Sequence, residues 1–136
     1  MYNPTANIID MQGYTVKDND GQQFIISGVL NVPAGGYAVL GNNDNPVTNG
    51  GVVVNYEYPS AFTFDNNGDE LIILDLSGTE VDRLVWTPSF DSNGRSSALV
   101  NPCTDNSVLA NWCTSDNMFS GSSSDRGTPG AANDCN

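Results

Sequence analysis

Apolar residues occur along the chain in short runs that polar, turn-forming residues interrupt. Residues 14–17 (YTVK) alternate apolar and polar side chains, stop at the DNDG sequence of residues 18–21, and resume at residues 23–26 (QFII). Asp-Gly between two such runs is typical of a tight β-hairpin, because glycine supplies the positive backbone angle that the turn needs. These two segments are therefore predicted to pair as neighbouring strands.

The same pattern continues beyond this hairpin. Short apolar segments predict further strands at residues 29–32, 37–40, 52–54 and 61–64. Residues 70–75 (ELIILD) are apolar at successive positions, which indicates a strand buried on both faces, and a turn at Ser77 and Gly78 leads into a strand over residues 80–86. Short strands with turn signals about every 8–12 residues are typical of a β-sandwich or barrel.

Helix signals are weak. The stretch from Cys103 to Ser120 contains neither glycine nor proline, but it is rich in Ser, Asn, Thr and Asp. One helical turn is predicted there, around residues 107–110, with Asp105 or Asn106 as its N-cap. A chain of 136 residues has room for one domain with a single core. We expect one domain over residues 1–136, with the main sandwich in 1–100 and a polar, cysteine-containing segment in 101–136.

The charge of the chain is strongly negative. The chain has sixteen acidic and four basic residues, which gives a net charge of −12. Nucleic acids and anionic membranes bind clustered Lys and Arg, so neither is expected as a partner. No stretch approaches the roughly 18 apolar residues of a membrane-spanning helix, and membrane insertion is not expected either.

Histidine is absent, which removes the usual general base and the commonest zinc ligand. Catalysis would have to use carboxylates or a thiolate. A pair of carboxylates could hydrolyse glycosides, but with sixteen acids some pair will always lie close, and no particular pair is indicated. We therefore predict that the protein is not an enzyme, and keep a carboxylate-based hydrolase as the second alternative.

The three cysteines, Cys103, Cys113 and Cys135, all lie in the last third of the chain. Their spacing matches no metal-binding motif, so one disulfide with one remaining thiol is predicted. The favoured pair is Cys103 with Cys113, while Cys103–Cys135 and Cys113–Cys135 stay open. A disulfide that holds a polar segment is typical of an oxidising compartment.

Oxygen-rich clusters make calcium a candidate cofactor. Asp65, Asn67 and Asp69 alternate along one loop, as calcium ligands do, and similar clusters occupy residues 18–20 and 42–45. The loop lacks the glycine and the distant glutamate of an EF-hand. Tight β-turns need the same residue types, and this structural interpretation is favoured over a metal site.

Aromatic residues offer a candidate binding face. Tyr56 and Tyr58 lie at alternate positions before Pro59, so both are expected on one face near a strand end, where they could contact a protein or a sugar. Three further aromatic residues could join them: Trp86, Phe90 and Trp112. The two tryptophans are interpreted as core or core-edge residues. Arg95 and Arg126, beside glycines in polar loops, are predicted to form buried Arg–Asp pairs that lock those loops.

Several motifs, in this order, resemble the lamin-tail domain, an immunoglobulin-like sandwich of nuclear lamins and of many secreted bacterial proteins. The motifs are Tyr-Asn-Pro at residues 2–4, DMQGYTVKD at 10–18, PAGGY at 33–37, the hairpin from Asn67 to Asp82, and Trp112 with GTPGAAN at 127–133. The resemblance covers nearly the whole chain. It implies an immunoglobulin-like β-sandwich and attachment to other molecules in place of catalysis.

The resemblance also implies one more strand before Tyr-Asn-Pro. Either the chain is a fragment that lacks its first strand, or that strand comes from elsewhere, and an uncovered edge invites strand donation or a homodimer. We therefore expect a secreted, non-catalytic module that binds a protein partner or anchors a larger protein to a surface. A carbohydrate-binding accessory domain is the leading alternative. The chromatin association of lamin tails is not expected, because no basic patch exists to carry it.

Overall fold

A computed structural model describes residues 1–88 and 94–135 of the chain, and it is nearly all β. Most of the strands are short. In chain order they are β1 (Ile9–Asp10), β2 (Thr15–Lys17), β3 (Gln23–Ile25), β4 (Asn31–Val32), β5 (Leu40–Gly41), β6 (Tyr56–Glu57), β7 (Asp69–Leu74), β8 (Glu80–Trp86), β9 (Ser97–Leu99) and β10 (Trp112–Thr114), with one 3₁₀ turn, η2 (Leu109–Asn111), before β10. This architecture confirms the predicted all-β class.

The largest sheet has four antiparallel strands in the order β3-β2-β7-β8. Val16 lies opposite Phe24 on one side and Ile73 on the other, so these three apolar side chains form one row across the sheet. The predicted hairpin of residues 14–17 and 23–26 is confirmed as β2 and β3. The predicted strand over residues 80–86 coincides with β8.

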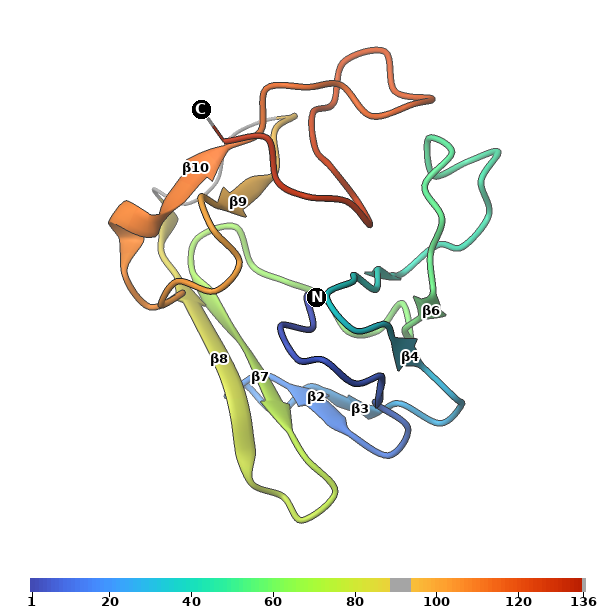
Figure 1. The fold of residues 1–136 in the computed structure, drawn as a ribbon, viewed down its shortest axis with the longest axis vertical. Helices are drawn as coiled ribbons and strands as arrows, with labels where there is room; N and C mark the ends of the chain where they lie inside the picture. The colour runs from blue at the N-terminus through green and yellow to red at the C-terminus, as the bar shows by residue number, and fades with distance from the viewer. Residues whose placement is uncertain (89–93, 136) are drawn as a thin grey trace.

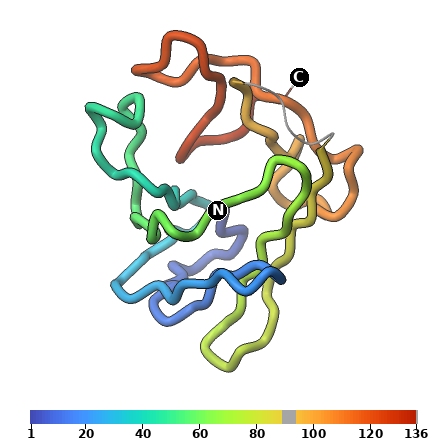
Figure 2. Tube along the Cα trace, turned by 180° about the vertical axis from the view of Figure 1, so that it is seen from behind, coloured from blue at the N-terminus to red at the C-terminus, as the bar shows by residue number. Residues whose placement is uncertain are grey.

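Three further strand pairs lie outside this sheet. β1 pairs with β4 and β9 with β10, both antiparallel, while β5 and β6 are parallel. In Figure 1 the long β7–β8 hairpin runs down one side of the molecule and β4 and β6 lie on the other. The N-terminus lies in the middle, between the four-stranded sheet and the C-terminal segment, and the view from behind agrees (Figure 2).

The hydrophobic core lies against the inner face of the four-stranded sheet. Its buried members come from β2, β3, β4 and β7 and from the segments between strands: Met11, Val16, Phe24, Ile26, Leu30, Val32, Ala38, Phe62 and Ile73. Ile72, the neighbour of Ile73 in β7, is also buried, with 2% of its surface exposed. β7 is therefore buried on both faces, as its unbroken apolar sequence predicts.

Two predicted strands are absent, and both segments are irregular. Residues 52–54 follow Gly50 and Gly51, which both adopt positive φ, and Val53 is exposed. In the segment 61–64, Phe62 is buried in the core, but its N–H closes a turn on Pro59. Apolar residues can thus enter the core from a loop, and apolar character alone cannot distinguish this case from a strand.

The helical turn forms later than predicted. It spans Leu109–Asn111, and its N-cap residue is Val108, which makes no side-chain capping bond. The carboxylate of Asp105 accepts hydrogen bonds from the N–H and hydroxyl of Ser107, so it caps a turn that precedes the helix. The prediction of Asp105 or Asn106 as N-cap is therefore wrong. The β9–β10 hairpin spans the expected boundary at residue 100.

Candidate interaction site

The N-terminal residues pair with the segment that leads into β5. Tyr2 forms an antiparallel bridge with Tyr37. Met1 exchanges two hydrogen bonds with Ala38: its amino group donates to the Ala38 carbonyl at 2.8 Å, and the Ala38 N–H donates to the Met1 carbonyl at 3.0 Å. This short antiparallel pairing stops at Met1, in the middle of the molecule (Figure 1).

Past this pairing the backbone continues into β5, which pairs with β6. The carbonyls of Val39 and Gly41 accept hydrogen bonds from residues 55–58, in and around β6. Successive residues of an extended strand direct their N–H and C=O groups to opposite sides, so those of Leu40 face the side on which Met1 lies.

An apolar cleft of about 220 Å³ opens beside this edge. Its walls come from the inner face of the four-stranded sheet, from β5 and from residues 58–64. They consist of Met1, Val16, Phe24, Leu40, Tyr58, Phe62, Phe64, Leu71 and Ile73. None of these side chains is charged at neutral pH, so the cleft offers an apolar surface directly over the core.

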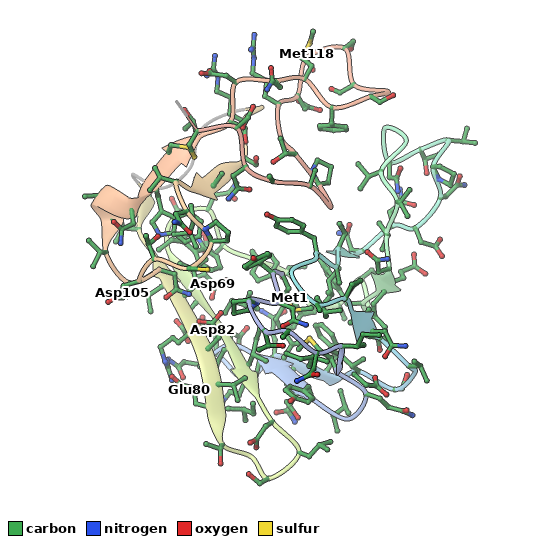
Figure 3. The ribbon with its side chains drawn as sticks, in the orientation of Figure 1. Met1, Asp69, Glu80, Asp82, Asp105 and Met118 are labelled. Carbon is green, nitrogen blue, oxygen red and sulfur yellow. A yellow bond between two sulfur atoms is a disulfide. The ribbon has the colours of Figure 1, made fainter. Side chains whose placement is uncertain are left out.

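A second, wider pocket of about 470 Å³ shares Met1, Leu71 and Ile73 with the cleft. It is more polar, and its lining includes Tyr2, Tyr37, Asp82, Asp105, Asn106 and Trp112. Figure 3 shows Asp82 on β8 and Asp105 in the loop before β10, both on the same side of Met1.

Hydrogen bonds fix the polar groups of this wider pocket. The Asn106 side-chain amide donates to Asp82 Oδ1 at 2.8 Å, and the Trp112 indole N–H donates to the Asn106 carbonyl at 2.9 Å. The hydrogen bonds from Ser107 lower the pKa of Asp105, so that carboxylate stays ionised at neutral pH. Burial lowers the pKa of the Met1 amino group, and the Asp82 carboxylate partly offsets this shift.

The predicted aromatic pair, Tyr56 and Tyr58, lies on one face, but that face points at the core. Both rings stack on Phe24, with centroids 6.1 Å away for Tyr56 and 5.6 Å away for Tyr58. The Tyr56 hydroxyl donates to the Ile25 carbonyl and accepts from the Ser27 N–H. Burial raises the pKa of Tyr58. Tyr58 lines the cleft and, together with Tyr56, a separate surface pocket, and binding by this pair stays a prediction.

Comparison with known proteins assigns the family. The family model of the Lamin Tail Domain matches residues 1–88. The chain belongs to the lamin tail domain family. No curated protein and no solved structure matches it. The match covers the four-stranded sheet and the whole cleft, and it ends before the cysteine-containing segment. Lamin tail domains are immunoglobulin-like, non-enzymatic interaction domains, so the family fits a cleft that binds a partner.

The disulfide of this lamin tail domain differs from the favoured pairing. Cys113 is bonded to Cys135, with Cα atoms 5.8 Å apart, and Cys103 is free and exposed. The predicted Cys103–Cys113 pair is therefore wrong, and one of the open alternatives is found. Cys103 is held in a surface turn, where its N–H donates to the Asn101 side chain. Cys113 lies in β10 opposite Ala98, and Cys135 Sγ lies 3.5 Å from the Ala98 carbonyl.

The candidate calcium loop has its carboxylates directed at its own backbone. Asp65 Oδ1 accepts from the N–H of Asn67 at 2.7 Å, and Asp69 Oδ2 accepts from the N–H of Asp65 at 2.8 Å. These bonds close a tight turn before β7. The described residues hold no group of three or more His, Cys, Asp or Glu side chains placed to bind a metal ion. A calcium site formed by Asp65, Asn67 and Asp69 stays a prediction.

One of the two predicted Arg–Asp pairs is found among the described residues, and it is exposed. Arg95 forms an ion pair with Asp116 at 2.7 Å, and the guanidinium of Arg126 donates to the Asp116 carbonyl. Both partners of the ion pair are more than one third exposed, at 37% and 56% of their side-chain surface. The prediction of a buried pair is wrong, because these loops lie at the surface of the C-terminal segment.

Two further predictions concern residues away from the cleft. Trp86 is half-buried at the end of β8, where its indole N–H donates to the Asp65 carbonyl and its ring meets Phe64 edge-on. Trp112 is also half-buried. A core or core-edge role for the two tryptophans stays a prediction. Phe90 lies outside the described residues. No helix in the described parts of the chain is long and apolar enough to cross a bilayer.

Sequence reasoning missed the structural role of Asn3. Its side chain is buried, with 2% of the residue exposed, and makes four hydrogen bonds. The amide donates to the carbonyls of Asn7 and Val32, and Oδ1 accepts from the N–H and hydroxyl of Thr5. Asn3 thereby anchors residues 1–7 to β4 and fixes the direction in which Met1 enters the cleft. The only signal in the sequence was its place in the Tyr-Asn-Pro motif.

Proposed function

We propose that this lamin tail domain is a non-catalytic module of an extracellular protein, and that it attaches that protein to a partner protein at the cleft beside Met1. One observation carries the proposal. The cleft leaves a wall of apolar side chains open at the surface directly over the core, with Phe64 42% exposed. Contiguous exposed apolar surface is costly in water and is typical of protein-interaction sites.

The character of the cleft wall supports a protein partner. Phe64 is 42% exposed at the wall, and Tyr58 and Leu71 are half-buried beside it. Aromatic and aliphatic side chains that partly cover a rigid core are what interface hot spots use. The net charge of −12 favours a neutral or basic partner and disfavours nucleic acid.

The disulfide supports an extracellular location. Cys113 and Cys135 lie 22 positions apart, and their bond ties the end of the chain to β10. Disulfides of this structural kind persist in oxidising compartments and are rare in the cytosol. Secretion, followed by attachment to a surface through the bound partner, is consistent with this bond.

Site-specific photo-cross-linking tests the proposed function. A photoreactive phenylalanine analogue replaces Phe64 at the cleft or, as the control, Val47, which is 89% exposed on a distant loop. The protein is then irradiated in the extracellular fraction of its source organism. We expect one defined protein adduct from position 64 and none from position 47. Equal adducts from both positions, or none from position 64, would contradict the proposal.

Carbohydrate binding is a second candidate, favoured by the wider pocket. Tyr2 and Tyr37 stand 5.0 Å apart, centroid to centroid, near Asp82 and Asn106. Aromatic faces with carboxylate and amide groups beside them suit a sugar ring and its hydroxyls. Affinity electrophoresis in gels that contain neutral polysaccharides tests this alternative. Retardation that Tyr37→Ala abolishes would support it, and unchanged mobility in every gel would remove it.

A further inference from the structure

We propose that a surface pocket beside β6, called the β6 pocket below, binds a neutral sugar unit of a glycan. The pocket has a volume of about 430 Å³, and its walls are formed by Ser27, Asn42, Tyr56, Glu57, Tyr58, Pro59 and Ser60. It shares Tyr58 with the cleft and no residue with the wider pocket. The inference therefore goes beyond the proposed function and concerns a separate site.

Hydrogen bonds and ring contacts hold the segments that form the β6 pocket. β6 pairs with β5, and just after β6 the Tyr58 N–H donates to the Gly41 carbonyl at 2.9 Å. The Tyr56 hydroxyl accepts from the Ser27 N–H at 3.2 Å, which ties β6 to the segment after β3. The Tyr56 ring stacks on Phe24 in the core. The pocket thus has its shape before a ligand enters, as small-molecule sites usually do.

Several polar side chains of the β6 pocket are open to a ligand. Within residues 1–88 and 94–135, the hydroxyls of Ser27 and Ser60 and the side-chain amide of Asn42 have no hydrogen-bond partner. Glu57 Oε1 accepts from the Asp44 N–H at 3.3 Å, which orients the carboxylate. The second oxygen of Glu57 accepts no hydrogen bond from the same residues. Together these groups offer a ligand both donors and acceptors.

This mixture of groups favours a neutral ligand that is rich in hydroxyls. A sugar hydroxyl donates and accepts, so it can pair with a serine hydroxyl, an amide or a carboxylate. The Glu57 carboxylate and the net charge of −12 repel an anion, and no described Lys or Arg lines the pocket to offset them. A Lys or Arg side chain of a partner supplies donors only. It could pair with Glu57 but would leave the N–H groups of Asn42 without an acceptor.

The apolar part of the β6 pocket suits the C–H face of a sugar ring. It consists of Tyr56 and Tyr58, which are half-buried, and Pro59, which is exposed. Tyrosines that present an apolar body and a polar tip are common where one side of a ligand is apolar and the other is hydrated. A few convergent polar groups beside such surface, in a volume of roughly 300–1,000 Å³, are typical of small-ligand sites.

Saturation-transfer difference NMR with single sugars tests the proposal. The probes are glucose, galactose, mannose and N-acetylglucosamine, and the charged comparisons are glucuronic acid and lysine amide. We expect saturation transfer to at least one neutral sugar and to neither charged compound. Transfer to none of the neutral sugars would overturn the proposal, as would transfer to lysine amide in their place.

Two exposed side chains of the β6 pocket provide variants that spare the core. Asn42→Ala and Ser60→Ala each remove a group that has no partner in the protein, so each should weaken sugar binding about fivefold. Asn66→Ala, in the exposed loop before β7, is the matched control and should leave the affinity within about twofold. Equal affinities of Asn42→Ala, Ser60→Ala and the control would place the sugar elsewhere.

Tyr37→Ala separates the β6 pocket from the wider pocket, because Tyr37 lines only the latter of the two. Sugar binding that survives Tyr37→Ala and is weakened by Asn42→Ala supports the β6 pocket. The reverse pattern would reject it in favour of the wider pocket. The cross-link from position 64 reports on the cleft, so the protein-interaction proposal holds or fails independently of both sugar sites.

Discussion

Tyr58 stacks on Phe24, with ring centroids 5.6 Å apart and ring planes inclined by 17°. Phe24 also meets Phe62 edge-on at 5.1 Å, so one buried ring organises the aromatic wall of the cleft. The candidate site is therefore a continuation of the hydrophobic core and shares its stability. Rigid support of this kind is what holds an interaction site in a fixed shape before the partner arrives.

Removal of the Phe24 ring should destabilise the domain strongly. Phe24 is 7% exposed and contacts three aromatic rings, so Phe24→Ala is expected to lower the free energy of unfolding by about 3–5 kcal/mol. Urea unfolding followed by tryptophan fluorescence measures the change. Tyr14→Phe, which keeps the ring, serves as the control. A loss under about 1 kcal/mol for Phe24→Ala would show that the ring is not in the core.

Asn3 provides a second test of the packing around Met1. Asn3→Ala leaves the buried Val32 carbonyl without its side-chain partner, at a cost of about 1–3 kcal/mol. It also removes the acceptor of the part-buried Thr5 N–H. Asn7→Ala, in an exposed position whose side chain makes none of these bonds, is the control. Thermal melting of both variants should show a large loss of Tm for Asn3→Ala only. Equal melting temperatures would contradict the anchoring role of Asn3.

The disulfide should contribute stability that the free cysteine does not. Closing the loop between Cys113 and Cys135 restricts the unfolded chain, so Cys113→Ser is expected to cost about 2–4 kcal/mol. Cys103→Ser should leave stability unchanged, because Cys103 is exposed and unpaired. Peptide mapping under non-reducing conditions identifies the pair directly. A fragment that links Cys103 to Cys113 would contradict the structure.

The thermal stability of the fold should depend on pH through Asp75, in the turn between β7 and β8. The hydroxyl of Ser77 and the N–H of Thr79 hydrogen-bond to the Asp75 carboxylate and lower its pKa in the folded state. The ionised carboxylate therefore stabilises the fold at pH values above the unfolded pKa, and this contribution is lost as the pH falls through the lowered folded pKa. Asp75→Asn should reduce Tm at pH 7, and the difference from the wild type should shrink on acidification.

Asp20→Asn, in an exposed turn, serves as the control for this series. Melting curves at pH 7, 5, 3 and 2 give the comparison. A difference between Asp75→Asn and the wild type that stays constant across the series would contradict the hydrogen-bonded carboxylate.

Calcium binding at the loop before β7 is decided by titration. The carboxylates of Asp65 and Asp69 accept hydrogen bonds from backbone N–H groups of the same loop. A calcium ion held by these carboxylates would have to replace those hydrogen bonds. If calcium binds there, millimolar calcium raises Tm, and Asp65→Asn together with Asp69→Asn removes the rise. An unchanged Tm at millimolar calcium would end the prediction.

The sequence predicted the regular parts of the fold because local patterns determine them. The DNDG turn between two apolar runs specified the β2–β3 hairpin, and the unbroken apolar run of residues 71–74 specified a strand buried on both faces. Phe62 could not be placed in this way. It enters the core from a turn, and only the tertiary structure distinguishes that case from a strand.

The site was harder to predict, because it depends on contacts between distant segments. Alternation predicts one face for Tyr56 and Tyr58, but it does not reveal that both rings pack on Phe24, more than thirty positions earlier. The cleft is lined by Met1, Leu40 and Leu71, which come from segments far apart in the sequence, and no local signal marks it. The cysteine pair likewise follows from the position of Cys135 beside Ala98, which spacing alone cannot reveal.

Comparison of Phe64→Ala with Val47→Ala tests the central claim most directly, because Phe64 lines the cleft and Val47 is 89% exposed on another loop. The measurement is the affinity of each variant for the protein that cross-links at position 64. We predict that Phe64→Ala weakens this binding at least about tenfold and that Val47→Ala leaves it unchanged. Equal affinity of the two variants would contradict the account.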